Sequence, residues 1–409
     1  MLRINKKTGE IPTDFRDDYL ELLWLLDQAA GLEHSLLVSY LYALFSIKDK
    51  YREVRGDLST RSYLEHSPNG RGGISVLKEH DSFLDVALEE MQHFSLVNRF
   101  LADLGAAPNL TPQVYPYSCD LYPFDLALIP LTRYASATYL WIEADACALS
   151  LDPECEGKGE PPEFIREVRE VLAKGSHRPI NGIPRNHLGS LYQRIVAQVR
   201  KVAAAPPAFL PAGFPWGDWD ERMNWILDQG EVAHYRFFRG VFTGEAFGVS
   251  DPWKRGRDYP SYNFRRLTAY PGDEDTIPNE DARQLAWLAD LHYWILLGLL
   301  DQGFRYRELR LRYAAIDAMT LGLWALGLHL ARVYQVGVPF DPFSTQIEMG
   351  RTPEFAAAVL GLLIREAQDL VCSLDARKLL PTDYDPTLFR VLLDNLQGAH
   401  ALDGSGRLL

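Results

Sequence analysis

Apolar residues recur at helical spacing along most of the chain. Between residues 17 and 49 they include Leu23, Leu26, Ala30, Leu37 and Leu41, which is the repeat of an amphipathic helix. Similar patterns predict helices over residues 17–49, 74–104, 126–151, 162–173, 185–204, 218–242, 281–304, 306–334, 353–376 and 387–397. In the third of these, Pro130 is expected in the first turn, where proline is tolerated. The pattern therefore predicts an all-α protein.

Loop signals divide the predicted helices into groups. Residues 69–73 read Asn-Gly-Arg-Gly-Gly, and residues 243–279 contain many Pro, Gly, Tyr and Arg residues. We predict a four-helix bundle over residues 12–248, an ordered connection over 249–280, and a helical extension over 281–400 that packs on the bundle. A chain of 409 residues is long enough to bury such a core.

Two Glu-x-x-His motifs, Glu90 to His93 and Glu231 to His234, lie in predicted long helices. A single glutamate precedes each motif, Glu33 before the first and Glu143 before the second. Residues three apart on a helix share a face, so each motif directs a carboxylate and an imidazole to one place. One Glu on each of two helices and Glu-x-x-His on each of two others is how a four-helix bundle holds two carboxylate-bridged metal ions.

All four glutamates are flanked by apolar residues at helical spacing, which predicts that they are buried. A buried carboxylate needs pairing or coordination, and a metal ion would supply it. Imidazole and carboxylate ligands suit iron, with manganese as the alternative. The competing interpretation is that both motifs are surface Glu–His pairs that stabilise their own helices.

Several residues near the motifs are candidates for further roles. Tyr40, Tyr139 and Tyr235 lie close to predicted ligands, so they could line a pocket or relay an electron, although ordinary core packing also accounts for them. Glu89 could orient a histidine of the opposite motif, or it could be a solvated helix residue. Cys147, one turn beyond Glu143, is predicted to be a small core residue.

Composition narrows the class of protein. The net charge is −13 and no segment concentrates Lys and Arg, which argues against a nucleic-acid binder. The first residues lack the apolar stretch of a secretory signal, and the apolar run 318–328 is too short to cross a bilayer. We therefore expect a cytoplasmic protein with no membrane partner. Four cysteines without CxxC spacing are expected to be reduced thiols: Cys119, Cys147, Cys155 and Cys372.

The motif segments also resemble a known family. Residues 86–110, VALEEMQHFSLVNRFLADLGAAPNL, are similar to the second-helix motif of the ferritin-like domains of iminophenyl-pyruvate dimer synthases, which act in bisindole pigment pathways of the violacein kind. Residues 31–48, 139–145 and 226–238 resemble the first, third and fourth ligand helices, and 337–343 resembles a late segment. The resemblance covers residues 15–345.

This resemblance implies a ferritin-like four-helix bundle that binds two iron ions, with manganese as the alternative. The implied metal ligands are Glu33, Glu90, His93, Glu143, Glu231 and His234. It also implies an O2-dependent oxidase or oxygenase of specialised metabolism that acts on a small aromatic or amino-acid-derived molecule. An electron donor and a homodimer partner are compatible with this activity.

One departure from the family pattern bears on the substrate pocket, and a second difference is the chain length. Many relatives carry extra residues between the glutamate and the histidine of the fourth helix, whereas here they stand three apart, and the dimer synthases are longer chains. Three other functions therefore stay open: a ferroxidase or iron-storage protein, a manganese enzyme that removes peroxide, and a bundle that keeps the ligands but serves as a partner-binding subunit.

Overall fold

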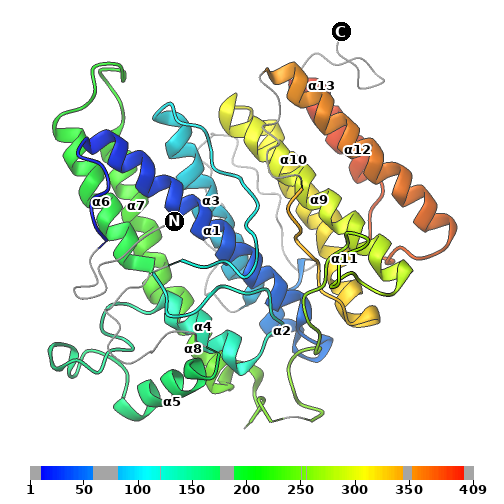
Figure 1. The fold of residues 1–409 in the computed structure, drawn as a ribbon, viewed down its shortest axis with the longest axis horizontal. Coiled ribbons are helices and arrows are strands. Elements are labelled where there is room, and N and C mark those ends of the chain that lie inside the picture. Colours follow the sequence, from blue (N-terminus) through cyan, green and yellow to red (C-terminus); the bar gives the residue numbers. More distant parts are fainter. Residues whose placement is uncertain are drawn as a thin grey trace. The chain divides into compact units, whose positions relative to one another are not determined.

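The computed structural model describes residues 11–58, 82–119, 121–175, 188–249, 251–254, 256–343 and 352–399. Within these ranges helices provide the regular structure and β-pairing is limited to isolated bridges, which confirms the all-α prediction. The chain forms two compact units, Met1–Ala106 with Tyr115–Ser261 and Ala107–Val114 with Tyr262–Leu409 (Figure 1). The division at Ser261 falls inside the predicted connection 249–280.

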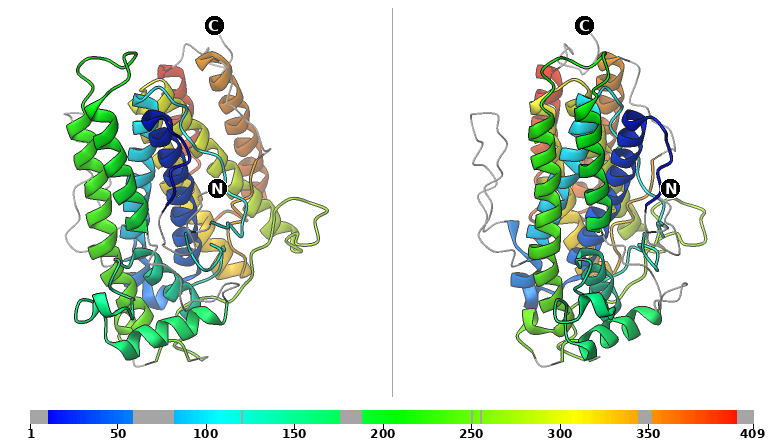
Figure 2. Two further views of the ribbon diagram at one scale, coloured as in Figure 1. Left: turned by 60° about the vertical axis from the view of Figure 1, so that its left-hand side comes forward. Right: turned by 90° about the vertical axis from the view of Figure 1, so that its left-hand side faces the viewer.

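The first unit is a helical bundle. Its main helices are α1 (Asp18–Ser46), α3 (Phe83–Asp103), α4 (Arg133–Glu143), α6 (Leu188–Ala204), α7 (Trp216–Gln229) and α8 (Tyr235–Thr243); the short helix α2 (Arg52–Arg55) follows α1. A π-helical segment, η4 (Gly230–His234), joins α7 to α8. α1 packs along α3 and α6, α6 along α7, and α4 along α8. Figure 2 shows α1, α3, α6 and α7 running side by side.

The third helix of this bundle is split in two. Because α7, η4 and α8 follow one another without a break, their partners α6 and α4 are two halves of one bundle position. The prediction of a helix over 126–151 is therefore wrong at both ends. The Thr132 side chain caps the start by accepting the Ala135 N–H, and α4 ends at Glu143, after which Ala144 is extended.

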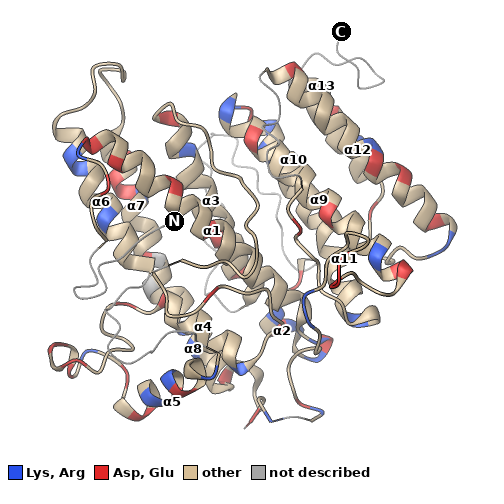
Figure 3. Ribbon diagram, viewed as in Figure 1, with Lys and Arg blue, Asp and Glu red and all other residues tan. Residues whose placement is uncertain are grey.

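The insertion after Glu143 contains α5 (Pro162–Ala173), whose apolar face packs against α4. Figure 3 marks several acidic and basic residues along α5. Cys147 and Cys155 form a disulfide with Cα atoms 5.1 Å apart. The expectation of four reduced thiols is therefore wrong for this pair, and no CxxC spacing signalled it. Within the described residues Cys119 and Cys372 form no disulfide.

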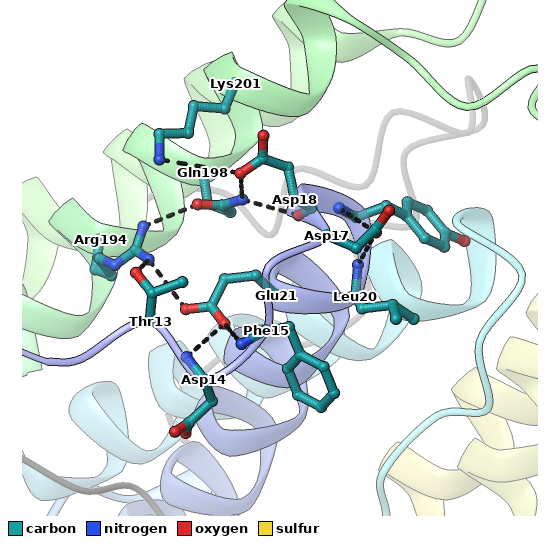
Figure 4. A network of polar contacts seen from close by, with 11 residues as sticks. Thr13, Asp14, Phe15, Asp17, Asp18, Leu20, Glu21, Arg194, Gln198 and Lys201 are labelled. Carbon is teal, nitrogen blue, oxygen red and sulfur yellow. Dashed lines mark hydrogen bonds and ion pairs between the residues drawn. The ribbon is translucent and has the colours of Figure 1, made fainter.

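A network of polar contacts fixes α6 against the start of α1 (Figure 4). The buried Glu21 carboxylate accepts the N–H groups of Asp14 and Phe15 at 3.0 and 2.9 Å, and Arg194 on α6 donates to it at 3.0 Å. Gln198, one turn further along α6, donates to the Asp18 carbonyl at 2.8 Å. These contacts fix the position of α6 along α1, and so the position of the side chains that α6 directs into the bundle.

We expect the Arg194→Met variant to lose about 2 kcal/mol of stability, because it leaves the buried Glu21 carboxylate without its charged donor. Denaturation by urea, followed by circular dichroism, measures the change. Arg200→Met is the matched control on the same helix, since the Arg200–Asp220 pair is exposed and such pairs contribute little. Equal stability of the two variants would show that the network does not hold α6.

The second unit is also helical. Its helices are α9 (Glu280–Arg305), α10 (Leu309–Asp317), α11 (Trp324–His329), α12 (Pro353–Ala376) and α13 (Leu388–Ala399), with π-helical segments η6 (Ala318–Leu323) and η7 (Leu330–Tyr334) on either side of α11. α9 packs against α10 and α12, and α13 packs against the same two helices. This arrangement accounts for the apolar pattern of the C-terminal third.

One continuous helix of the second unit, Leu309–Tyr334, is long and apolar enough to span a membrane by length and composition. It is longer than the apolar run 318–328 on which the sequence prediction rested. In the described structure 61% of its apolar window is buried, as in the core helix of a water-soluble protein. The helix is therefore weak support for a membrane span.

Candidate metal centre

Five of the six predicted ligand side chains meet in the core of the first unit. They come from α1, α3, the last residue of α4 and the π-helical segment η4, and each is at most 1% exposed: Glu33, Glu90, His93, Glu143 and His234. The side chain of the sixth, Glu231, lies outside the described part of the structure, so its role stays a prediction. The alternative of two surface Glu–His pairs is wrong for the residues described.

The five side chains form two groups that share Glu90. Glu33, Glu90 and His93 make one, and Glu90, Glu143 and His234 make the other, with the ligand atoms of each group within 4.8 Å of one another. His93 Nδ1 lies 3.6 Å from Glu90 Oε2, and His234 Nδ1 lies 3.0 Å from Glu90 Oε1. The two Glu90 oxygens thus face different histidines, which is the arrangement of a carboxylate that bridges two metal ions.

The buried carboxylate oxygens at the centre lack hydrogen-bond donors. Among the described residues, Glu33 Oε2, both oxygens of Glu90 and Glu143 Oε2 have no hydrogen-bond partner. Such groups are costly to bury, and metal coordination removes that cost. Gly230 keeps space open beside them, because a Cβ at this position would lie 3.0 Å from Glu143 Oε2. The residues therefore fit two metal ions, with a nitrogen and oxygen set that suits iron or manganese.

Two tyrosines hold the outer oxygens of the single glutamates. The Tyr40 hydroxyl donates to Glu143 Oε1, and the Tyr192 hydroxyl donates to Glu33 Oε1. Burial raises the pKa of both phenols well above 10, so both stay protonated and can donate. Each glutamate is thus fixed by a phenol on one oxygen and directs the other oxygen to the metal position.

Sequence reasoning missed Tyr192. It lies on α6, beyond the insertion, in a helix without a ligand motif. The only signal was its place on the apolar face of that helix, between Leu188 and Ile195, which are also buried. That signal does not distinguish a tyrosine that contacts a ligand from one that packs in the core.

Glu89 orients His234. Its carboxylate is 7% exposed, and Oε2 lies 2.7 Å from His234 Nε2. When Nε2–H donates to this carboxylate, Nδ1 is the nitrogen left to ligate a metal ion beside Glu90 and Glu143. The alternative that Glu89 is a solvated helix residue is therefore wrong.

The three tyrosines predicted from the sequence occupy different positions. Of the three, Tyr40 is the one that hydrogen-bonds to a described ligand side chain, Glu143. Tyr139 packs edge-on against Tyr40 with ring centroids 4.7 Å apart, and its hydroxyl donates to the Ser39 carbonyl at 3.1 Å. Tyr235 donates to Glu160 at 3.2 Å. A part for any of the three in catalysis stays a prediction.

The second Glu-x-x-His motif is not α-helical. Gly230–His234 form a π-helical turn, which is wider than the α-helical turn assumed for the spacing of Glu231 and His234. The assumption of α-helical register is therefore wrong here. His234 still reaches the cluster, with Nδ1 3.6 Å from Glu143 Oε2. π-helical turns of this kind often occur at functional sites.

The charges of the metal-free cluster are coupled. Burial, followed by the charge of Glu90, raises the pKa of Glu33 well above 4.5, and burial also raises that of Glu143. Burial acts in the same direction on Glu90, but His234 and His93 lower its pKa below the usual range. Burial opposes protonation of His234, yet Glu143, Glu89 and Glu90 raise its pKa well above 6.5. The metal-free site therefore holds protons that metal binding would release.

We expect Tyr192→Phe to weaken metal binding at the Glu33 position by ~10-fold, as the loss of an outer partner does in other metal sites. Tyr139→Phe is the matched control, because its hydroxyl contacts a backbone carbonyl and no ligand. Each variant should lose about 1 kcal/mol of stability, the worth of one hydrogen bond. Metal titration together with thermal unfolding separates the two effects, and equal metal affinities in both variants would contradict the assigned role of Tyr192.

A family model described as Ferritin-like matches residues 26–211. The matched range includes Glu33, Glu90, His93 and Glu143, and ends before the fourth helix. No curated protein and no solved structure matches the chain significantly. His234 is therefore supported as a ligand by the geometry of the structure and not by the family match, and Glu231 stays a prediction.

Proposed function

Since residues 26–211 support a place in the ferritin-like superfamily, and the bundle brings together a carboxylate and histidine cluster, we propose that this protein is a non-haem di-iron enzyme. In this proposal it uses O2 to oxidise or oxygenate a small molecule. The observation that carries the proposal is the buried Glu90 carboxylate, whose two oxygens lie between His93 and His234 without hydrogen-bond donors.

Each of the described residues would have its own role at this centre. Two iron ions bound here would supply the redox chemistry with O2. Glu33 and His93 would hold one ion, Glu143 and His234 the other, and Glu90 both. Tyr40 and Tyr192 would keep the two terminal carboxylates in place, and Glu89 would retain the Nε2 proton of His234 when Nδ1 releases its own.

An aromatic cluster packs against Tyr40, which holds Glu143. The ring of Tyr40 packs on Phe238 at 5.0 Å between centroids, and Phe83 packs on Phe237 and Phe238 at 5.2 and 5.6 Å. Such a cluster excludes water, which strengthens electrostatic interactions at the centre and protects reactive species. It favours an enzyme that controls access over an open site for iron uptake.

The proposed substrate class is a small aromatic or amino-acid-derived molecule of specialised metabolism. It rests on the resemblance of residues 31–48, 86–110, 139–145 and 226–238 to the iminophenyl-pyruvate dimer synthase type. The chain also continues for a second unit, Tyr262–Leu409, beyond the bundle that holds the ligands. A storage shell needs only the bundle, so this extra unit favours an enzyme.

Anaerobic loading with Fe(II) followed by exposure to O2 tests the proposal. We expect two iron ions per chain and O2 consumption that a reductant and an aromatic amino-acid derivative increase. Iron that accumulates far beyond two ions per chain would indicate storage instead. Retention of manganese with breakdown of hydrogen peroxide would indicate the peroxide-removing alternative. Absence of any iron-dependent O2 consumption would refute the proposed activity.

A further inference from the structure

The insertion between the two halves of the third helix connects two predicted ligands of one metal position. It begins directly after Glu143 at the end of α4. Through Glu160 it returns to α8, which begins directly after His234. Glu143 and His234 belong to the same ligand group, whereas Glu33 and His93 of the other group come from α1 and α3. The insertion is thus placed to act on one metal position.

The insertion starts with a closed loop. Asp145 Oδ1 accepts the N–H groups of Cys147 and Ala148 at 2.6 and 2.7 Å, which turns the chain sharply away from α4. The Cys147–Cys155 disulfide then closes the loop eight residues later. The disulfide therefore holds the far end of the loop close to the end of α4.

The closed loop fixes the position of Glu160. Gly159 lies so near Cys147 that a Cβ would be 2.2 Å from the Cys147 carbonyl oxygen, so only glycine fits without a backbone shift. The Glu160 N–H donates to the Ala148 carbonyl at 2.9 Å. The backbone at residues 159 and 160 is thus packed on the segment that contains Cys147.

The Glu160 carboxylate in turn holds the start of α8. It accepts from Tyr235 at 3.2 Å and from Arg239 Nε and Nη2 at 2.7 and 3.2 Å. The Arg239 guanidinium also lies 5.1 Å from the centroid of the Phe164 ring, which belongs to α5 in the same insertion. Because Tyr235 directly follows His234, a displacement of Glu160 acts on the helical turn that presents His234 Nδ1 to the cluster.

We propose that the Cys147–Cys155 disulfide is a redox-sensitive clip that sets the metal affinity of the Glu90, Glu143 and His234 position. The inference rests on the metal centre of the proposed function. An external dithiol transfers two electrons and two protons: the S–S bond breaks, both cysteines become thiols, and the dithiol becomes a disulfide. Cys147 is partly exposed between the exposed residue Ala146 and the buried Ala148, so a reductant can reach it. Reduction frees the loop, and Glu160 then loses its fixed place.

Titration with Mn(II), with the free ion followed by electron paramagnetic resonance, tests the clip without any enzyme activity. The protein is titrated in its oxidised form and again after reduction by a dithiol that is removed under argon. We expect the first metal position, that of Glu33, Glu90 and His93, to bind Mn(II) equally in both forms. The second position, that of Glu90, Glu143 and His234, should bind Mn(II) at least ~10-fold more weakly after reduction, as when an outer partner is lost. A thiol assay before and after treatment confirms the state of the disulfide.

Three variants separate the clip from general destabilisation. The Cys147→Ser, Cys155→Ser double variant should show the weaker second position in both conditions. Cys372→Ser, which alters an exposed cysteine outside the disulfide, should respond to reduction like the unaltered protein. Gly159→Ala leaves both cysteines in place but pushes the chain away from Cys147, so its second position should be weak even when oxidised. Circular dichroism checks that each variant is folded.

The outcomes distinguish the clip from the metal centre. If both positions bind Mn(II) equally in the oxidised and reduced protein, or weaken equally on reduction, the clip is refuted and the proposed function stands. An oxidised protein with four titratable thiols also refutes the clip alone. If neither form binds Mn(II) or Fe(II), the metal centre is refuted, and the clip with it.

Discussion

Glu90→Gln is expected to remove both metal ions from the protein. Glu90 is the residue that the two ligand groups share, so its loss takes a ligand from each position. The loss of affinity should exceed the ~10–100-fold that follows removal of an outer partner. Metal analysis after gel filtration measures the bound ions, and O2 consumption with Fe(II) should fall to the background rate.

Glu89→Gln, one residue earlier on α3, is the matched comparison. It removes the carboxylate that orients His234 but no predicted ligand, so we expect one ion to bind normally and the other ~10–100-fold more weakly. The metal-free Glu90→Gln protein should be less stable than the unaltered metal-free protein at neutral pH, because the buried His234 loses one of the carboxylates that raise its pKa. Two tightly bound ions in Glu90→Gln would exclude a bridging role for this residue.

The metal-free protein is expected to lose stability as the pH rises from about 4.5 to above neutral, whereas the metal-loaded protein should not. The pKa values of Glu33 and Glu143 are raised above 4.5 in the folded state, so the folded protein keeps protons that the unfolded chain has released. Stability then falls with pH until the raised pKa values are passed. The raised pKa of His234 acts in the same direction above 6.5.

Glu90 has the opposite effect on the pH dependence of stability, and it acts at low pH. Its pKa is lowered in the folded state, so its contribution is present above about 4.5 and is lost as the pH falls through the folded value. Thermal unfolding of chelator-treated protein between pH 5 and 8 measures the loss of stability expected from Glu33, Glu143 and His234. Each kcal/mol of lost stability lowers the unfolding midpoint by roughly 2–4 °C in a unit of this size. A midpoint independent of pH without metal would show that these carboxyl groups are not buried together.

The helical spacing of apolar residues was sufficient to predict most of the helices, because the packing of those helices follows their local sequence pattern. α1, α5 and α12 lie within the predicted ranges 17–49, 162–173 and 353–376. α5 and α12 each bury one apolar face, and α1 is buried on all sides from Ala29 to Ser46. α4 is different. Residues 144–151 continue the apolar pattern of the helix, but the Asp145 side chain binds the N–H groups of Cys147 and Ala148 and so stops it.

The burial of the predicted ligands was also predictable, because the Glu-x-x-His motifs and the single glutamates lie on apolar helix faces, and five of the six side chains are buried close together. The residues that support the ligands were predictable only in part: Glu89 was a candidate for orienting a histidine, whereas Tyr192 was not identified. Tyr192 reaches Glu33 from 159 positions away, and Glu89 reaches His234 from 145 positions away. Such pairs depend on how helices pack, which a single sequence does not reveal. The Cys147–Cys155 pair was missed for a different reason, since its proximity depends on a local turn and not on a motif.

The end of α4 at Glu143 has an electrostatic consequence of its own. Aligned peptide dipoles give the C-terminus of a helix a partial negative charge of about half a unit, carried by its last carbonyl groups. An ordinary helix would run past its ligand and place that charge several turns away. Here the helix stops at the ligand residue, so its negative end adds to the field of the Glu143 carboxylate. The break in the third helix thus makes the backbone itself favour a cation at one of the two metal positions.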